Sequence, residues 1–299
     1  MIRSAEFDRI SSLLYRDAGV VLSPDKAYFV EARLSPVLRD LGWDYSMLCR
    51  RLDAEPDHPA RQLVVEALVT HETRFFRDPA YFDLLRDRLL PSIIAERSKS
   101  RRLRIWSAAA ATGQEALSLA ILISEDFPQL RAWDIEILGT DLSHRVIGQA
   151  RRACYLEHEI SRGLTPALRD RYFDRNGGTW VAGDEIREWT RFEQLNLLQP
   201  WPGLLSFDLV LLRHVLIYLD AEHRTHILGR MRRHIEPFGV LLLGGVESTT
   251  PVDDFDRHFA GSTTWFTPAT RARETTSFAP QPSDRKALAS RRSTDDTHR

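Results

Sequence analysis

A run of small side chains beside an acidic residue marks the first segment that could do chemistry, residues 104–120 (RIWSAAAATGQEALSLA). An apolar stretch ends near Trp106, small residues continue to Gly113, and Glu115 falls in the first turn of an expected helix. Small residues let a ligand approach the backbone, and a helix N-terminus offers free N–H groups. The segment lacks the GxGxxG spacing of dinucleotide sites. Glu115 would repel phosphate and suits a ligand amine, while a tightly packed strand-to-helix turn is the structural alternative.

Two further polar positions follow apolar segments. Asp141 ends the segment 135–141, where α/β folds hold a ribose diol; it could equally cap the helix expected from about residue 143. Arg213 and His214 follow the apolar segment 207–212, at the strand end where ligands bind in open α/β sheets, and Tyr218 comes shortly after. His214 could act as a base, but a hydrogen-bonding or capping role is more common at such a position.

Aromatic and cationic side chains lie side by side in the segment 69–91, VTHETRFFRDPAYFDLLRDRLLP. Phe75 and Phe76 stand between Arg74 and Arg77, just before Asp78-Pro79. Aromatic rings beside cations could close over a purine or a carboxylate. A hydrophobic latch between two domains is the alternative, and the two roles are compatible.

The elements that must position these residues change character near residue 100. Residues 1–90 show helical spacing of apolar residues, which predicts a small all-α domain. From residue 102, short apolar segments alternate with helical ones, which predicts parallel strands joined by crossover helices in an α/β domain over 91–270. The expected strands lie near 103–106, 135–138, 207–212 and 240–243, and the expected helices near 115–124, 143–153 and 221–235.

Two segments interrupt this alternation. Asn176-Gly177-Gly178 predicts the turn of a small antiparallel β-hairpin, inserted at about 172–192. The tail 271–299 is rich in Ser, Thr, Arg, Asp and Pro and has few large apolar residues, so we expect it to be disordered.

Composition narrows the classes of function. The chain has 299 residues, 43% of them hydrophobic, with 41 Lys and Arg against 42 Asp and Glu. The formal net charge of -1 argues against a nucleic-acid-binding protein, which needs a basic excess. Two cysteines are too few for a disulfide framework or a thiolate metal site. No apolar stretch approaches the ~20 residues of a membrane helix, and the first residues lack a signal core, so we expect a cytoplasmic protein without membrane insertion.

Seven segments, in order, resemble the CheR family of chemotaxis methyltransferases over about residues 5–268. They are HETRFFRD, WSAAAATGQEALS, LGTDLS followed by ARRACY, RYF, FEQLNLL, FDLVLLRHVLIYLD and PFGVLLLGGVES. The resemblance implies an S-adenosylmethionine-dependent protein-glutamate O-methyltransferase. It also implies a Rossmann-like methyltransferase domain with an inserted antiparallel β-subdomain, preceded by a small all-α domain. The substrates would be the cytoplasmic methylation helices of methyl-accepting chemotaxis receptors, the cofactor product would be S-adenosylhomocysteine, and no metal would take part.

The resemblance also implies roles for residues at the matching motif positions. The cofactor contacts would be His71, Thr73 and Arg77 in the linker, Glu115 at the methionyl amine, Asp141 at the ribose, Asn196 and Leu197 beside the adenine, and Arg213 and His214 beside the methionine. Arg77 and Tyr218 would be catalytic and face the reacting centre. Lys26, Arg33 and Arg39 would present positive charge to the acidic methylation helix of a receptor.

Some motif positions depart from the family's usual residues. His71 and His214 stand where Asn is usual, Gln114-Glu115-Ala116-Leu117 replaces Glu-Glu-Pro-Tyr, and the last strand ends Gly245-Val246-Glu247 where Gly-His-Ser-Glu is usual. These departures keep open an alternative, a catalytically weakened module that acts as a regulatory or scaffolding partner in a chemosensory pathway.

A methyltransferase that acts on another acceptor is a further interpretation of these motifs, whereas the missing GxGxxG disfavours a dehydrogenase. The short hairpin insertion favours a protein that works independently of a receptor's C-terminal pentapeptide.

Overall fold

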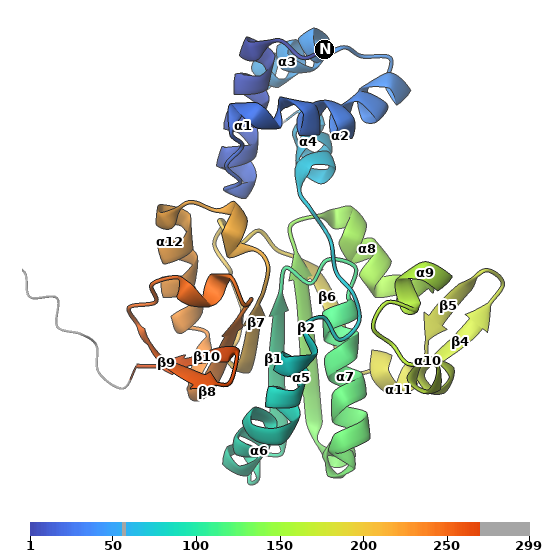
Figure 1. The fold of residues 1–299 in the computed structure, drawn as a ribbon, viewed down its shortest axis with the longest axis vertical. Helices are drawn as coiled ribbons and strands as arrows, with labels where there is room; N and C mark the ends of the chain where they lie inside the picture. Colours follow the sequence, from blue (N-terminus) through green and yellow to red (C-terminus); the bar gives the residue numbers. More distant parts are fainter. Residues whose placement is uncertain (56–57, 270–299) are drawn as a thin grey trace, which may run out of the picture.

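The computed structural model describes residues 1–55 and 58–269, so the expected disordered tail 271–299 lies outside the described residues. An all-α N-terminal lobe stands above an α/β domain, as the sequence predicts (Figure 1). Helix α1 buries Phe7, Ile10, Leu13 and Leu14 along one face, and Gly19 ends it in the left-handed conformation. The helices of this lobe are α1 (Ser4–Ala18), the 3₁₀ turn η1 (Pro24–Lys26), α2 (Ala27–Asp40), α3 (Tyr45–Ala54) and α4 (Ala60–Leu68).

The α/β domain is built on a seven-stranded sheet in the order β6-β2-β1-β7-β8-β10-β9. The first five strands in this order run parallel, and β10 and β9 are antiparallel at one edge. The strands are β1 (Arg102–Ala108), β2 (Asp134–Asp141), β6 (Thr190–Gln194), β7 (Phe207–Leu212), β8 (Ile235–Leu243), β9 (Phe255–Ala260) and β10 (Thr263–Pro268).

Helices cover both faces of the sheet, as a parallel sheet requires. Side chains of β1 alternate between two cores: Leu103 and Ile105 pack toward the α7 side, whereas Trp106 and Ala108 pack toward the α12 side. The helices of this domain are α5 (Pro79–Leu84), a π-helical turn η2 (Leu85–Leu89), α6 (Leu90–Arg97), α7 (Gln114–Asp126), the 3₁₀ turn η3 (Pro128–Ala132), α8 (His144–Arg152) and α12 (Ala221–Arg232). Two more 3₁₀ turns, η4 (Leu216–Tyr218) and η5 (Glu247–Thr249), follow β7 and β8.

A small antiparallel sheet is inserted between α8 and β6. Its order is β3-β5-β4, with β3 (Cys154–Leu156), β4 (Phe173–Asn176) and β5 (Thr179–Ala182), and short helices α9 (Glu157–Ile160), α10 (Pro166–Tyr172) and α11 (Asp184–Arg187) flank the strands. Strands β4 and β5 pair across the turn at Gly177 and Gly178. The sequence did not predict β3, because three residues directly after a helix are too few to show an alternating pattern.

Other elements also differ from the sequence-based expectation. The helix expected to reach residue 235 ends at Arg232, because the carbonyl of His234 accepts a hydrogen bond from Phe207 N at 2.8 Å and joins the chain to the sheet. Strands β6, β9 and β10 were not predicted, because none of them has an apolar run in the sequence. The polar residues of β6 and β9 are tolerated because these two strands form the edges of the sheet.

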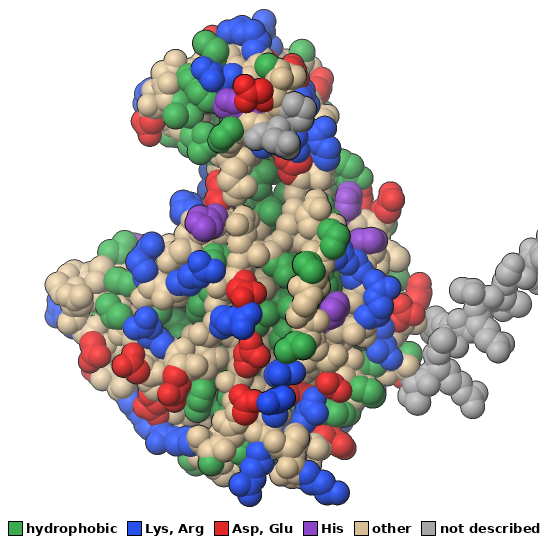
Figure 2. Space-filling model, turned by 180° about the vertical axis from the view of Figure 1, so that it is seen from behind, with side chains coloured by type: hydrophobic (Ala, Val, Ile, Leu, Met, Phe, Trp, Pro, Cys, Tyr) green, Lys and Arg blue, Asp and Glu red, His purple; other side chains and the backbone are tan. Residues whose placement is uncertain are grey.

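The N-terminal lobe is joined to the α/β domain by more than the linker 69–78. An isolated bridge pairs Val20 with Leu219, and Val21 N donates to Tyr218 O at 3.1 Å. The lobe stands on a narrow neck in the space-filling view (Figure 2). No helix within the described ranges is long and apolar enough to cross a membrane.

Candidate active site

The chain reverses its direction of travel across the sheet at β1, because β2 pairs with one side of β1 and β7 with the other. Ligands of open α/β sheets bind outside the carboxyl ends of the strands at such a point. The loops that leave β1 and β7 here hold Ala109, Ala111 and His214 at positive φ values of 61°, 50° and 62°. Left-handed backbone at non-glycine residues is costly and concentrates at functional sites.

Two adjoining cavities open at this point. The larger contains about 790 Å³ of space free of protein atoms, part of it open to solvent. Ala18 and Val20 from the N-terminal lobe line it together with residues of the α/β domain. The sequence-predicted residues that line it are His71, Asp141, Asn196, Leu197, Arg213, His214 and Tyr218. Thr73, Arg77 and Glu115 line the smaller cavity, which shares Arg213 and His214 with the larger one, so all the predicted residues surround one continuous site.

Asp141 ends β2 with its carboxylate turned back toward the loop after β1. Oδ2 accepts a hydrogen bond from Ala111 N at 3.0 Å, and Oδ1 accepts one from Ser143 N at 3.0 Å. The helix-capping role falls to Ser143, whose hydroxyl accepts from Val146 N. A carboxylate has about four acceptor positions, so Asp141 keeps capacity for ligand hydroxyls. Burial is the main cause that raises the pKa of Asp141.

His71 faces Asp141 from the linker. Its Nε2 is buried without a hydrogen-bond partner and lies 3.7 Å from Asp141 Oδ1. Burial lowers the pKa of His71, against the opposing effect of the Asp141 charge. His71 is therefore the neutral imidazole near neutral pH, with one ring nitrogen available to a ligand.

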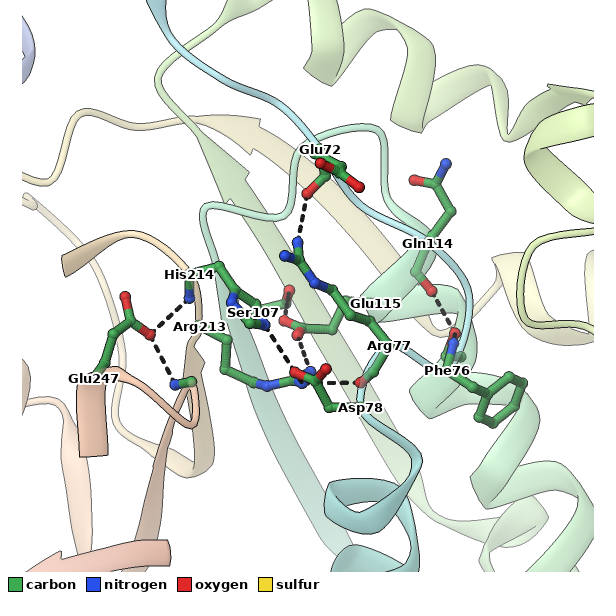
Figure 3. A network of polar contacts seen from close by, with 12 residues as sticks. Glu72, Phe76, Arg77, Asp78, Ser107, Gln114, Glu115, Arg213, His214 and Glu247 are labelled. Atoms are coloured by element: carbon green, nitrogen blue, oxygen red, sulfur yellow. Dashed lines mark hydrogen bonds and ion pairs between the residues drawn. The ribbon is translucent and has the colours of Figure 1, made fainter. Parts of the chain in front are cut away.

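Arg213 is the cation of the site, and its side chain is 1% exposed. Nη1 donates to Glu115 Oε2 at 2.8 Å, and Nη2 donates to Asp78 Oδ2 at 2.6 Å (Figure 3). Ser107 fixes the other oxygen of Glu115, because its hydroxyl donates to Oε1 at 2.7 Å. The buried Nε of Arg213 has no partner. A carboxylate and a guanidinium thus lie side by side, which suits a ligand that carries both an amine and a carboxylate.

The other predicted residues, Arg77, Tyr218 and Asn196, differ in how they contact the cavities. Arg77 lines the smaller cavity, and its Nη1 donates to Glu72 O at 2.7 Å. Tyr218 lies at the rim of the larger cavity with 39% of its surface exposed. The amide of Asn196 is used within the protein, because Nδ2 donates to Asp17 O at 2.8 Å and Oδ1 accepts from Leu198 N at 2.9 Å. Asn196 therefore shapes the cavity through its position more than through a free amide.

These residues fit S-adenosylmethionine, the cofactor that the resemblance implies. The acidic Asp141, the Glu115–Arg213 pair and the orphaned nitrogens of His71 and Arg213 match a ribose diol joined to an amino acid. Small residues at 109 and 111 leave the backbone open to a ligand. No group of three or more potential metal ligands occurs among the described residues.

Two carboxylates of the site were missed by the sequence analysis. Asp78 bonds to both Arg213 and His214, and Glu247 accepts backbone N–H bonds from Gly244, His214 and Val215. Asp78 precedes a proline at a helix start, which is typical of an ordinary N-cap. Asp78 ends the HETRFFRD segment and Glu247 lies in PFGVLLLGGVES, so the family motifs were the available signal, but their partners are distant in sequence or bonded through the backbone and no role followed from the motifs.

Comparison with known proteins identifies the family of the domain that holds this site. The family domain described as "CheR methyltransferase, SAM binding domain" matches residues 71–264, and "CheR methyltransferase, all-alpha domain" matches residues 5–69. The chain is 37% identical to chemotaxis protein methyltransferase 1 of Pseudomonas aeruginosa over 257 residues, which cover 84% of this chain and 93% of that protein.

Two other relatives are similar over the same extent. Chemotaxis protein methyltransferase Cher2 of Pseudomonas putida is 34% identical, with 83% of this chain and 92% of that protein covered. Chemotaxis protein methyltransferase 1 of Vibrio cholerae is 33% identical, with 85% and 92% covered. The order of the strands, the site at the end of β1 and these matches lead to one conclusion: the chain belongs to the CheR methyltransferase family and contains its S-adenosylmethionine-binding domain.

Proposed function

We propose that this protein transfers the methyl group of S-adenosylmethionine to glutamate side chains of chemotaxis receptors and forms glutamate methyl esters. The observation that carries the proposal is the pair of adjoining cavities. The larger offers Asp141 and Arg213 to the cofactor, and the smaller, where Glu115 pairs with Arg213, places Arg77 where a substrate carboxylate would enter. We expect the protein to work in the cytoplasm, on the side of the membrane where it would meet the methylation helices of the receptors.

The reaction needs little acid–base chemistry from the protein. The cofactor supplies a methyl group on a positively charged sulfur, which leaves as a neutral thioether when the methyl carbon bonds to the substrate oxygen. A glutamate side chain has a solution pKa of about 4.3, so it is ionised at neutral pH and attacks without a general base. What remains for the chain is to align the carboxylate with the methyl group and to exclude water.

Arg77 and Tyr218 are the residues that we assign to the reacting centre. Arg77 is held by the carbonyl of Glu72 through one of its five N–H donors, so others stay available for a charge-assisted bond to the incoming carboxylate. Tyr218 is partly exposed at the rim of the larger cavity and would donate to the same group or close the wall around it. His214, which departs from the family's usual Asn, would contact the methionine part together with Arg213.

The other cofactor contacts would come from residues that line the two cavities. Glu115 would bind the methionyl amine, and Asp141 would accept from the ribose hydroxyls with its remaining lone pairs. Leu197 and the backbone at Asn196 would flank the adenine, and His71 and Thr73 would close the pocket from the linker.

Substrate capture would use three cations of the N-terminal lobe. Lys26, Arg33 and Arg39 are exposed on η1 and α2, and the charge of Arg33 reaches His71 closely enough to contribute to its lowered pKa. These three side chains, of which Arg33 acts on His71 in the pocket, would attract acidic groups on the methylation helix of a receptor.

The inserted β-subdomain is relevant to how the protein would recognise a receptor. Its β4–β5 hairpin turns through Gly177 and Gly178 alone, which leaves little loop for an additional peptide contact. We therefore propose that the protein works independently of a receptor C-terminal pentapeptide. Stable capture of the protein by such a peptide on a bead would contradict this.

Methyl transfer from labelled S-adenosylmethionine to receptor-containing membranes tests the function. We expect incorporation that mild alkali releases as methanol, because carboxyl methyl esters hydrolyse whereas N-methyl groups do not. A receptor whose methylation-site glutamates are replaced by alanine serves as the control. Binding of S-adenosylhomocysteine without any transfer would instead support the weakened regulatory module, and alkali-stable label would point to another acceptor.

A further inference from the structure

Asp78, in the linker, is bonded to both residues that follow β7. Its Oδ2 lies 2.6 Å from Arg213 Nη2 and 2.8 Å from His214 Nε2 (Figure 3). The carbonyl of Arg77 also accepts from Arg213 Nη2, at 2.9 Å. An ionised carboxylate only accepts hydrogen bonds, so the His214 ring donates from Nε2.

The backbone at Asp78 is itself unusual. Its φ of 59° places a non-glycine residue in the left-handed region directly before Pro79, the first residue of α5. Such a conformation persists only where surrounding contacts hold it. The bonds to Arg213 and His214 are contacts of that kind, because they tie the linker to the end of β7.

His214 is held from two sides. Its own φ is 62°, and Glu247 accepts from the N–H groups of His214 at 2.7 Å and of Val215 at 2.6 Å. Glu247 also accepts from Gly244 N at 2.8 Å, and a Cβ at Gly244 would lie only 2.5 Å from the same carboxylate. The backbone of His214 is thus fixed by Glu247 from the end of β8, while its ring is fixed by Asp78.

Asp78 does not line either cavity, whereas Arg213, His214 and Glu115 do. Its effect on a ligand must therefore pass through Arg213 and His214. The guanidinium of Arg213 is 1% exposed and lies between two carboxylates, Asp78 and Glu115. Loss of Asp78 would leave this buried cation with one carboxylate and a freer side chain.

We propose that Asp78 is a positioning residue: it holds Arg213 and His214 in the geometry that binds the methionyl end of the cofactor, so that cofactor affinity depends on the conformation of the linker. The proposal rests on the same pocket as the proposed function. It adds that the linker completes the cofactor site before any receptor is bound.

Calorimetry with S-adenosylhomocysteine on the full chain tests the proposal through Asp78→Asn, which keeps the size and removes the charge. We expect the dissociation constant to rise about tenfold or more, as for loss of a charge-assisted bond at a buried site. The KM for S-adenosylmethionine should rise with it, while the KM for the receptor stays near the wild-type value. Asp83→Asn is the matched control, because Asp83 is an exposed residue of α5 that pairs with Arg86, and it should leave both constants unchanged.

A double-mutant cycle separates positioning from general destabilisation. Asp78→Asn and His214→Asn should be non-additive in cofactor affinity, because each removes the same contact. Should Asp78→Asn fail to fold, Asp78→Ser provides the same test with a shorter neutral side chain and the same expected loss.

These experiments separate failure of the positioning role from failure of the proposed function. Wild-type affinity in a folded Asp78 variant, or strict additivity in the cycle, would overturn the positioning role. Absence of S-adenosylhomocysteine binding by the wild type would overturn the proposed function. Equal rises in the KM for both substrates would show that Asp78 supports only the fold.

Discussion

Nε2 of His71 lies 3.7 Å from Oδ1 of Asp141, and the imidazole nitrogen is buried without a hydrogen bond. Burial lowers the pKa of His71 below 6.5, a shift that the charge of Asp141 opposes and the charges of Arg145 and Arg33 reinforce, while Glu66 also opposes it. Burial raises the pKa of Asp141 above 3.8, against the hydrogen bonds that its carboxylate accepts. The linker thus brings a neutral imidazole to the carboxylate proposed to hold the ribose.

The first prediction is a loss of stability of the wild type, relative to His71→Asn, as the pH falls below 6.5. In that range the unfolded chain binds a proton on His71 that the folded chain does not, which favours unfolding. The raised pKa of Asp141 acts in the opposite direction, since it favours the folded state as the pH falls, but Asp141 is present in both proteins. Thermal unfolding of the two from about pH 7 to about pH 5 measures the difference. Parallel profiles would show that the folded protein protonates His71 as readily as the unfolded chain does.

Arg77→Ala should lower turnover about 10- to 100-fold, because it removes a charge-assisted bond to the substrate carboxylate. The unfolding midpoint should change little, since this side chain donates a hydrogen bond to the nearby Glu72 carbonyl, five residues away. Arg74→Ala, three residues earlier and exposed, is the matched control. Near-normal methyl transfer by the Arg77 variant would refute its catalytic role.

Replacing Arg33 and Arg39 by alanine should raise the KM for the receptor and leave turnover at saturation unchanged. The physical reason is attraction between these two arginines and an acidic helix, which salt screens over about 10 Å at 0.1 M. The KM of the wild type should therefore rise with salt, and that of the double variant should rise less. Arg50→Ala, on the neighbouring α3, should behave as the wild type. A KM that ignores ionic strength would argue against electrostatic capture.

Tyr15→Phe should weaken both the attachment of the N-terminal lobe and cofactor binding. The hydroxyl of Tyr15 donates to Asp220 Oδ2 at 2.6 Å, and the lobe contributes Ala18 and Val20 to the larger cavity. A backbone bond from His223 and the Tyr15 hydroxyl are the main causes that lower the pKa of Asp220 to about 2. The stability from this carboxylate is present above pH 3.8 and is lost as the pH falls toward 2, so the variant should show less acid sensitivity.

The Tyr15 prediction is measured by S-adenosylhomocysteine titration and by acid unfolding of the two proteins. Tyr28→Phe is a suitable control, since Tyr28 is an exposed residue of the same lobe and lines neither cavity. Identical acid unfolding of wild type and Tyr15→Phe would show that the lobe is held by its other contacts.

Asp208→Ala should destabilise the fold by about 3 kcal/mol, the scale for breaking a buried ion pair. Asp208 is fully buried in β7, where it accepts from Arg97 Nε at 2.7 Å and from Arg104 N at 2.8 Å. Asp134→Ala breaks an exposed pair with Arg102 and should cost less than about 1 kcal/mol. Urea unfolding compares the two, and equal losses would mean that Glu236 and water satisfy the Arg97 charge once Asp208 is removed.

The local pattern of apolar residues was sufficient to predict the strands at the centre of the sheet. The apolar runs at β1, β2, β7 and β8 are predictable because parallel strands buried on both faces need unbroken hydrophobic sequence. The edge strands β6 and β9 escaped notice because one side of each lacks a neighbouring strand and polar residues are allowed there. Helix α12 was extended too far because the helical spacing shows no break before the chain enters the sheet.

The sequence by itself determined the family and the buried strands near whose ends Glu115, Asp141 and Arg213 lie, since unbroken apolar runs mark those strands. Only the tertiary structure decided that Asp78 and Glu247 hold His214 and that the N-terminal lobe covers the cavity. Asp78 meets His214 across 136 positions of sequence, and Glu247 meets it through a backbone N–H. Contacts of this kind depend on which strands become neighbours in the sheet, and that is a property of the whole packed chain.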